Sequence, residues 1–138
     1  MKFKGRCHFL QYLSAKPVKW GLKVWALCDA ETYYMSVMRV YIGKSNPEPE
    51  DPDHVSLTLL GEKVVANLVA PYLNKYHFFD NYFTSLPLLE YLFSKDTYAC
   101  GTMQNNRKGL PKHIQNKKVV KKSGDTVKMM KENTQVVA

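Results

Sequence analysis

Asp80 is the side chain whose type and position best suit chemistry, because it directly follows the aromatic run His77–Phe79. A short apolar run that ends at an acid and then reaches a Thr-Ser pair and a proline predicts a strand, a turn and the start of a helix. Phe78 and Phe79 are expected to be buried and Asp80 to be presented. The rim at the carboxyl ends of the strands is where an open α/β sheet holds ligands and metals. An aspartate at this position is also a common turn former or helix cap, so both interpretations stay open.

A basic segment is the second feature that could do chemistry. Of the formal net charge of +8, residues 104–138 carry +7, because nine Lys or Arg side chains stand there against two acids. Such a segment favours polyanions, since each phosphate that is neutralised releases a condensed counterion. A solvated, charged chain end is the alternative interpretation. The candidate nucleic-acid contacts are Arg107, Lys108, Lys112, Lys117, Lys118, Lys121 and Lys122.

The cysteines and histidines do not suggest a metal site or a disulfide framework. The three cysteines are an odd number without a short pairing interval, and none of the four histidines lies three or four residues from another His or Cys. No apolar run approaches the roughly 18 residues that a membrane span needs, and the N-terminus lacks the apolar core of a signal peptide. An intracellular protein without a membrane partner is therefore expected.

The first half of the chain carries the pattern of a β-hairpin. Residues 19–28 alternate and then become apolar on both sides, which predicts a strand whose second half is covered on both faces. Turn residues at 29–32 and a second strand over 34–42 complete the hairpin. Residues 43–56 hold three prolines and four acids and are expected to form a loop.

Helical patterns dominate the second half. Apolar residues recur at helical spacing over 64–73, and Pro71 should end or kink that helix just before itself. Ser85 or Leu86 is expected to cap a second helix that has a proline in its first turn. The inner stripe of this second helix is expected to be Leu88, Leu89, Leu92 and Phe93.

Two shorter elements are expected after the second helix. Residues 97–103 predict another sheet strand, with Cys100 and Gly101 closely packed. The basic segment then predicts one hairpin around Ser123–Asp125.

Four stretches of the sequence together resemble one family. They are FKGRCHFLQYLSAKPVKWGLKVWALCDAETYYM (3–35), VVANLVAPYLNK (64–75), FFDNYFTSLPLLEYLFSK (78–95) and CGTMQNNRKGLPK (100–112). In this order they resemble the transposase domain of piggyBac transposases and the proteins derived from them. The resemblance implies a DDE-type recombinase with an RNase H-like core, in which three aspartates bind two divalent ions, Mg²⁺ or Mn²⁺. Asp80 matches the second of these aspartates, as a catalytic residue and metal ligand.

The resemblance also implies that this chain corresponds to the middle of the family domain. The first family aspartate is expected before residue 3, and the third is expected beyond the insertion domain, so neither has a counterpart here. The fold class is then α/β, an incomplete RNase H-like core with a mixed sheet, a hairpin and flanking helices, which lacks its first strand. The expected division is 1–103 as the partial core and 104–138 as the basic junction and the truncated start of the insertion domain. Where the family commonly has glycine this chain has Tyr33, which is strained if the position needs a positive φ.

The expected function follows from the missing acids. A two-metal site needs several carboxylates that converge on one point, and Asp80 alone cannot hold two ions. The chain is therefore expected to be a piggyBac transposase-derived fragment that binds no metal stably and does not cleave DNA. One alternative is a domesticated, non-catalytic module that binds DNA through its basic segment. Another is a remnant or partial gene model whose exposed sheet edge pairs with another chain. A nuclear location is implied by the resemblance alone.

Overall fold

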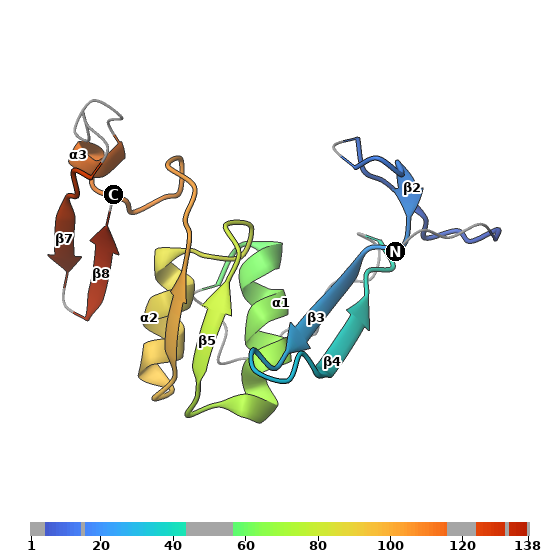
Figure 1. Cartoon of the computed structure of the whole chain (residues 1–138), viewed down its shortest axis with the longest axis horizontal. Coiled ribbons are helices and arrows are strands. Elements are labelled where there is room, and N and C mark those ends of the chain that lie inside the picture. The colour runs from blue at the N-terminus through green and yellow to red at the C-terminus, as the bar shows by residue number, and fades with distance from the viewer. Residues whose placement is uncertain (1–4, 15, 44–56, 116–123, 132, 138) are drawn as a thin grey trace. The chain divides into compact units, whose positions relative to one another are not determined.

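Short sheets and helices alternate along the computed structural model (Figure 1), which describes residues 5–14, 16–43, 57–115, 124–131 and 133–137. The expected α/β class is confirmed, although the described strands form four two-stranded sheets instead of one mixed sheet. The chain divides into two units, Met1–Glu50 and Asp51–Ala138. No helix among the described residues is both long enough and apolar enough to cross a membrane.

The first unit consists of two antiparallel strand pairs. Strand β1 (Gln11–Tyr12) pairs with β2 (Trp20–Gly21), and β3 (Val24–Cys28) pairs with β4 (Met35–Val40). The second pair is the predicted hairpin. Its first strand begins at Val24, after Trp20 and Gly21, which pair with β1. The expectation of cover on both faces of its second half is wrong, since Ala26 and Cys28 are exposed.

The hairpin turn is organised by Asp29 and contains a strained tyrosine. The Asp29 carboxylate accepts bonds from the amide and the hydroxyl of Thr32, both at 2.7 Å. Its carbonyl accepts from the amide of Tyr33 at 3.0 Å. Tyr33 has a φ of 58°, which confirms that this position requires the left-handed region. A side chain with a Cβ costs about 1–2 kcal/mol there.

Replacing Tyr33 with glycine is therefore expected to stabilise the first unit by about 1 kcal/mol, because glycine removes the left-handed penalty. The Tyr33 side chain is 84% exposed, so its loss removes little packing. Both tryptophans of the chain, Trp20 and Trp25, lie in this unit, so urea titration followed by tryptophan fluorescence reports on it. The matched control is Tyr34→Gly, which removes a similarly exposed ring at a residue without a positive φ and should not stabilise. Equal effects of the two substitutions would contradict the strain at Tyr33.

The second unit is built around a β-α-β crossover. Helix α1 (Leu60–Val69) passes into the 3₁₀ turn η2 (Ala70–Tyr72), so the helix ends where Pro71 predicts, because proline cannot donate the next helical bond. Strand β5 (Tyr76–Phe79), helix α2 (Leu86–Ser94) and strand β6 (Tyr98–Gly101) follow, and β5 pairs with β6 in parallel. Figure 1 shows the two strands side by side with the helices behind them.

The core of this unit lies between the helices and the inner face of β5 and β6. Leu88 and Leu92 are fully buried, as predicted for the inner stripe of α2. Phe93 is exposed, and its ring rests 5.9 Å from the ring of Tyr98 at the sheet, so its assignment to the inner stripe is wrong. The buried residues that form the core cluster are Leu57, Val65, Ala66, Val69, Leu88 and Leu92.

An aromatic surface covers the outer face of the β5–β6 pair. Tyr76 and Phe78 are 77% and 75% exposed, and the Tyr76 ring stacks on the ring of Tyr98 at 5.4 Å. The expectation that Phe78 is buried is therefore wrong. Alternate side chains of a strand point to opposite faces, and His77 and Phe79 take the inner one.

The same alternation decides two further expectations on β6. Cys100 lies on the outer face and is exposed, so the expectation that it is closely packed is wrong. Gly101 lies on the inner face and is closely packed, as expected, because an added Cβ would lie 2.5 Å from the carbonyl oxygen of Phe79.

The last elements are a short helix and a hairpin. Helix α3 spans Lys112–Gln115, and β7 (Lys128–Lys131) pairs antiparallel with β8 (Thr134–Val137). The hairpin turn lies between Lys131 and Thr134. The predicted hairpin around Ser123–Asp125 falls partly outside the described residues and stays a prediction. The predicted loop over 43–56 falls almost entirely outside the described residues.

Candidate functional site

Asp80 directly follows β5 and begins the Asp80 turn, which we define as residues 80–85. Its carboxylate oxygen Oδ1 accepts a hydrogen bond from the amide of Tyr82 at 3.0 Å. Its carbonyl oxygen accepts from the amides of Phe83 at 3.0 Å and Thr84 at 3.2 Å, and from the Thr84 hydroxyl at 2.9 Å. The Asp80 side chain remains exposed. The residue is thus a turn former, and it is also presented at the carboxyl end of a parallel strand.

Arg107 reaches the Asp80 turn from the segment that follows β6. Its Nη2 atom donates to the carbonyl oxygen of Asn81 at 3.1 Å and to that of Tyr82 at 2.5 Å. The Nε atom of the same side chain is buried and has no hydrogen-bond partner among the residues that the structure describes. The guanidinium is therefore engaged with the backbone that carries Asp80.

Two glycines allow neighbouring elements to approach this turn closely. A Cβ on Gly61, in the first turn of α1, would lie 3.2 Å from the carbonyl oxygen of Tyr82. A Cβ on Gly101 would meet the Phe79 carbonyl oxygen and, still closer, the Thr84 hydroxyl oxygen. The turn is packed between backbone segments at both places, which leaves it little room to move.

A buried acid joins the starts of the two helices. Glu62 is 2% exposed, and its Oε2 atom accepts from the amides of Thr58 and Leu59, each at 2.9 Å. Its Oε1 atom accepts from the Ser85 hydroxyl at 2.5 Å. Ser85 in turn caps α2 by accepting from the amide of Leu88 at 3.3 Å, which confirms Ser85 as the N-cap. The end of the Asp80 turn is thereby tied to α1.

Sequence reasoning missed Glu62, and it named Arg107 only as a candidate nucleic-acid contact without its bonds to the Asp80 turn. The signal for Glu62 is its place at the third position of α1, where Glu bonds back to the N-cap backbone in a capping box. That signal is obscured because Leu59 stands at the N-cap, where Ser or Thr would be recognisable. No local signal points to the Arg107 bonds, since they join residues 25 and 26 positions apart.

The donor set around Asp80 does not fit a pair of divalent ions. Among the residues that the structure describes, no group of three or more His, Cys, Asp or Glu side chains could hold a metal ion. A two-metal site requires several converging carboxylates. Asp80 supplies one, and one of its oxygens already accepts a bond from its own turn. The site can accept hydrogen bonds but cannot clamp two metals.

The predicted nucleic-acid contacts are placed only in part. Lys108 and Lys112 are exposed on the segment from the end of β6 to α3, and Arg107, just before Lys108, is half-buried against the Asp80 turn. Exposed lysines of this kind are free to meet phosphates as point charges. The four remaining lysines, Lys117, Lys118, Lys121 and Lys122, lie outside the described residues.

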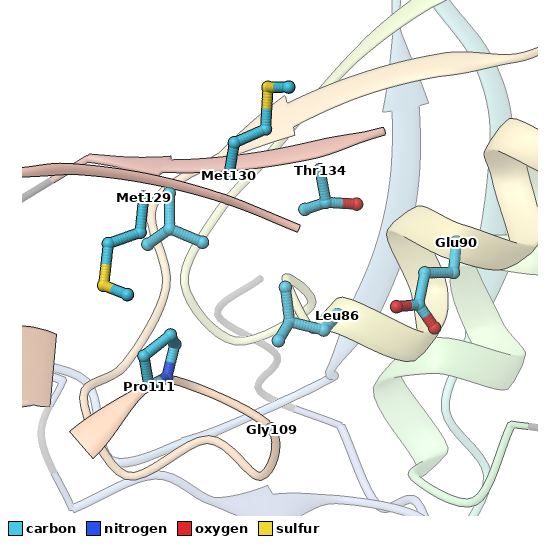
Figure 2. A pocket seen from close by; sticks show the side chains of 8 residues that line it. Leu86, Glu90, Gly109, Pro111, Met129, Met130 and Thr134 are labelled. Carbon is cyan, nitrogen blue, oxygen red and sulfur yellow. The ribbon is translucent and has the colours of Figure 1, made fainter. Parts of the chain in front are cut away.

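A separate cavity of about 200 Å³ lies between α2, the segment before α3 and the β7–β8 hairpin. Figure 2 shows Leu86, Pro111 and the two methionines Met129 and Met130 around it, with Glu90 to one side. Its lining is mostly apolar and lacks converging polar groups. It therefore lacks the placed polar groups that orient a substrate in a catalytic site.

Comparison with known proteins gives consistent results. A family model described as "Transposase IS4" matches residues 1–138. The human protein "PiggyBac transposable element-derived protein 3" is 32% identical over 104 residues, which are 74% of this chain and 17% of that protein. The human "Chimeric ERCC6-PGBD3 protein" is likewise 32% identical over 104 residues, 74% of this chain and 10% of that protein.

One solved structure shares the fold closely. A piggyBac transposase in a synaptic complex with hairpin DNA superposes with a TM-score of 0.81 and 29% sequence identity. The match covers 98% of this chain and 27% of the transposase. The chain thus spans well under a third of the length of each of these proteins.

Proposed function

We propose, because this chain belongs to the piggyBac family of transposases and transposase-derived proteins, that its 138 residues bind duplex DNA without cleaving it. The family relation supplies the DNA partner, since the similar transposase was solved as a complex with DNA. The charge of the basic segment supplies the means, because +7 of the net charge of +8 lies in residues 104–138. A nuclear location is part of the same proposal.

The proposal keeps the finer assignment made from the motifs. The crossover of β5, α2 and β6 belongs to an RNase H-like core, residues 1–103, and residues 104–138 form the basic junction and the start of an insertion domain. Asp80 is the counterpart of the second family aspartate. In support, Asp80 lies at the carboxyl end of a parallel strand, which is where α/β folds place their functional side chains.

The proposed lack of DNA cleavage rests on one observation. The Asp80 carboxylate is bonded within its own turn, and the described part of the chain brings no cluster of three metal-ligating side chains together. DDE transposases depend on divalent metal, and two ions are needed to clamp both the attacking and the leaving oxygen. These residues do not fit that pair, so no chemical step is assigned to them. The exposed lysines hold phosphates, and Arg107 contributes its charge from the edge of the turn.

DNA binding is expected to depend on salt and on the lysines of the basic segment. Phosphate contacts alone give log K that falls linearly with log salt, with a slope of about −0.9 per contact. Lys117→Gln combined with Lys118→Gln should therefore reduce the slope by about 2, measured by fluorescence anisotropy with duplexes of unrelated sequence. Lys16→Gln combined with Lys19→Gln removes the same charge from the first unit and should leave the slope unchanged. Equal losses in the two double variants would contradict binding through the basic segment.

Cleavage provides the test of the second half of the proposal. Incubation of the chain with supercoiled plasmid and Mg²⁺ or Mn²⁺ is expected to give no nicked product. Nicking that needs the metal and disappears in Asp80→Asn would overturn the proposal, because it would demonstrate that Asp80 works with ligands supplied in another way.

A second candidate function is favoured by the outer face of the β5–β6 pair. Parallel strands are normally covered by helices on both faces, whereas Tyr76, Phe78 and Tyr98 stand exposed here. This arrangement suits a segment that works inside a longer transposase, which would cover these rings and supply further carboxylates. The two candidates differ when the cleavage experiment is repeated with a longer protein that contains this segment, since only the longer protein could complete a two-metal site and nick the plasmid.

A further inference from the structure

The segment between β6 and α3, residues 104–111, is held in place at both ends. We call it the junction segment. The amide of Arg107 donates to the carbonyl of Gln104 at 3.0 Å, which closes a turn around the arginine. Leu110 is buried and anchors the other end of the segment. The side chain of Arg107 therefore leaves a backbone that is itself held in place.

We infer that Arg107 is a positioning residue, which fixes the junction segment to the Asp80 turn and so holds Asp80 in its presented position. A single nitrogen, Nη2, bonds the successive carbonyls of Asn81 and Tyr82 at 3.1 and 2.5 Å. The amide of the same Tyr82 donates to the Asp80 carboxylate at 3.0 Å. Arg107 bonds the carbonyl oxygen and Asp80 bonds the amide of the same peptide group, the one that joins Asn81 to Tyr82. Loss of one of these bonds should therefore weaken the other.

A second close approach supports the packing of the junction segment next to this turn. A Cβ on Gly109, whose φ is +92°, would lie 3.1 Å from the Cδ1 atom of Leu86. Leu86 is the first residue of α2 and directly follows the Asp80 turn. The junction segment therefore bonds to the turn through Arg107 and approaches the residue just after the turn closely at Gly109.

The chemistry of the side chain explains why an arginine serves here. Its guanidinium is planar, so its N–H groups have fixed directions. Bonds from a charged donor are stronger than neutral ones. The Nε atom of the same group is buried and makes no hydrogen bond to the described residues, so the bonds that the group makes to the turn are those of Nη2. This role does not depend on whether the chain binds DNA.

Amide hydrogen exchange of the full chain, followed by NMR, tests the inference. In Arg107→Gln the amides of Tyr82, Phe83 and Thr84 should exchange at least about tenfold faster, because the turn opens locally without its charged donor. The amides of Leu89 and Leu92 in α2 should keep their rates. Lys108→Gln, an exposed neighbour that removes the same charge, is the matched control and should change neither set.

Three outcomes decide the result. In Arg107→Lys the turn amides should exchange at rates between those of the wild type and Arg107→Gln, since an ammonium keeps the charge but not the planar geometry. If the turn and helix amides of Arg107→Gln accelerate by the same factor, the arginine supports global stability only and the inference fails. If the turn amides are unchanged, it also fails. Salt-dependent DNA affinity of the same variants reports separately on the proposed function.

Discussion

Replacing Gly101 with alanine is expected to destabilise the second unit by about 3 kcal/mol, which is a large share of the stability of a small domain. The new methyl group would lie 2.5 Å from the carbonyl oxygen of Phe79 and closer still to the Thr84 hydroxyl. Phe79 is the register partner of Gly101, so that carbonyl cannot retreat without opening the strand pair. The Thr84 hydroxyl cannot retreat without giving up its bond to the Asp80 carbonyl. Urea denaturation followed by far-UV circular dichroism measures the loss.

The matched control for this substitution is its neighbour on the same strand. Cys100→Ala places alanine on the exposed outer face and should change the free energy of unfolding by less than about 0.5 kcal/mol. If Gly101→Ala were as mild as Cys100→Ala, the close approach of β6 to the Asp80 turn would be refuted.

Replacing Glu62 with alanine is expected to cost a similar amount, about 3 kcal/mol. Three donors lose their partner at once: the amides of Thr58 and Leu59 and the hydroxyl of Ser85. Hydrogen bonds to a charged group contribute about 1.5–3 kcal/mol each, and leaving buried donors unsatisfied adds to the loss, although such terms do not sum fully. The same urea titration gives the magnitude.

Two further variants separate the causes of that loss. Glu62→Gln keeps the shape and one acceptor oxygen, so it should fall between the wild type and Glu62→Ala. Glu90→Gln removes an exposed acid from α2 and should stay within about 0.5 kcal/mol of the wild type. A Glu62→Ala protein as stable as Glu90→Gln would contradict the role of Glu62 as the shared acceptor of the two helix starts.

Elements set by local chemistry were predictable from the sequence. Pro71 ends α1 because it lacks an amide hydrogen, and Ser85 caps α2 because its hydroxyl can bond an amide of the first turn. Tyr33 has the positive φ that the family's glycine at this position implied. The four motif stretches led to the piggyBac family, which the comparisons confirm.

Features set by distant partners were not predictable in this way. The buried position of Glu62 depends on Ser85, 23 residues away, and the bonds of Arg107 depend on a turn 25 residues away. An apolar run fixes a strand but not the face that each ring takes, so Phe78 was placed in the core although it points outward. The pairing of β7 with β8 likewise had no local turn signal in the sequence analysis.

The outer face of β5 and β6 exposes three aromatic rings, those of Tyr76, Phe78 and Tyr98. Self-association of the chain through this face is therefore expected to depend on protein concentration. Two molecules that meet through such rings remove apolar area from water at about 25 cal/mol per Å². The apparent molar mass of the polypeptide from static light scattering should accordingly rise with its concentration. Titrations are best extrapolated to infinite dilution, where self-association no longer competes with the process under study.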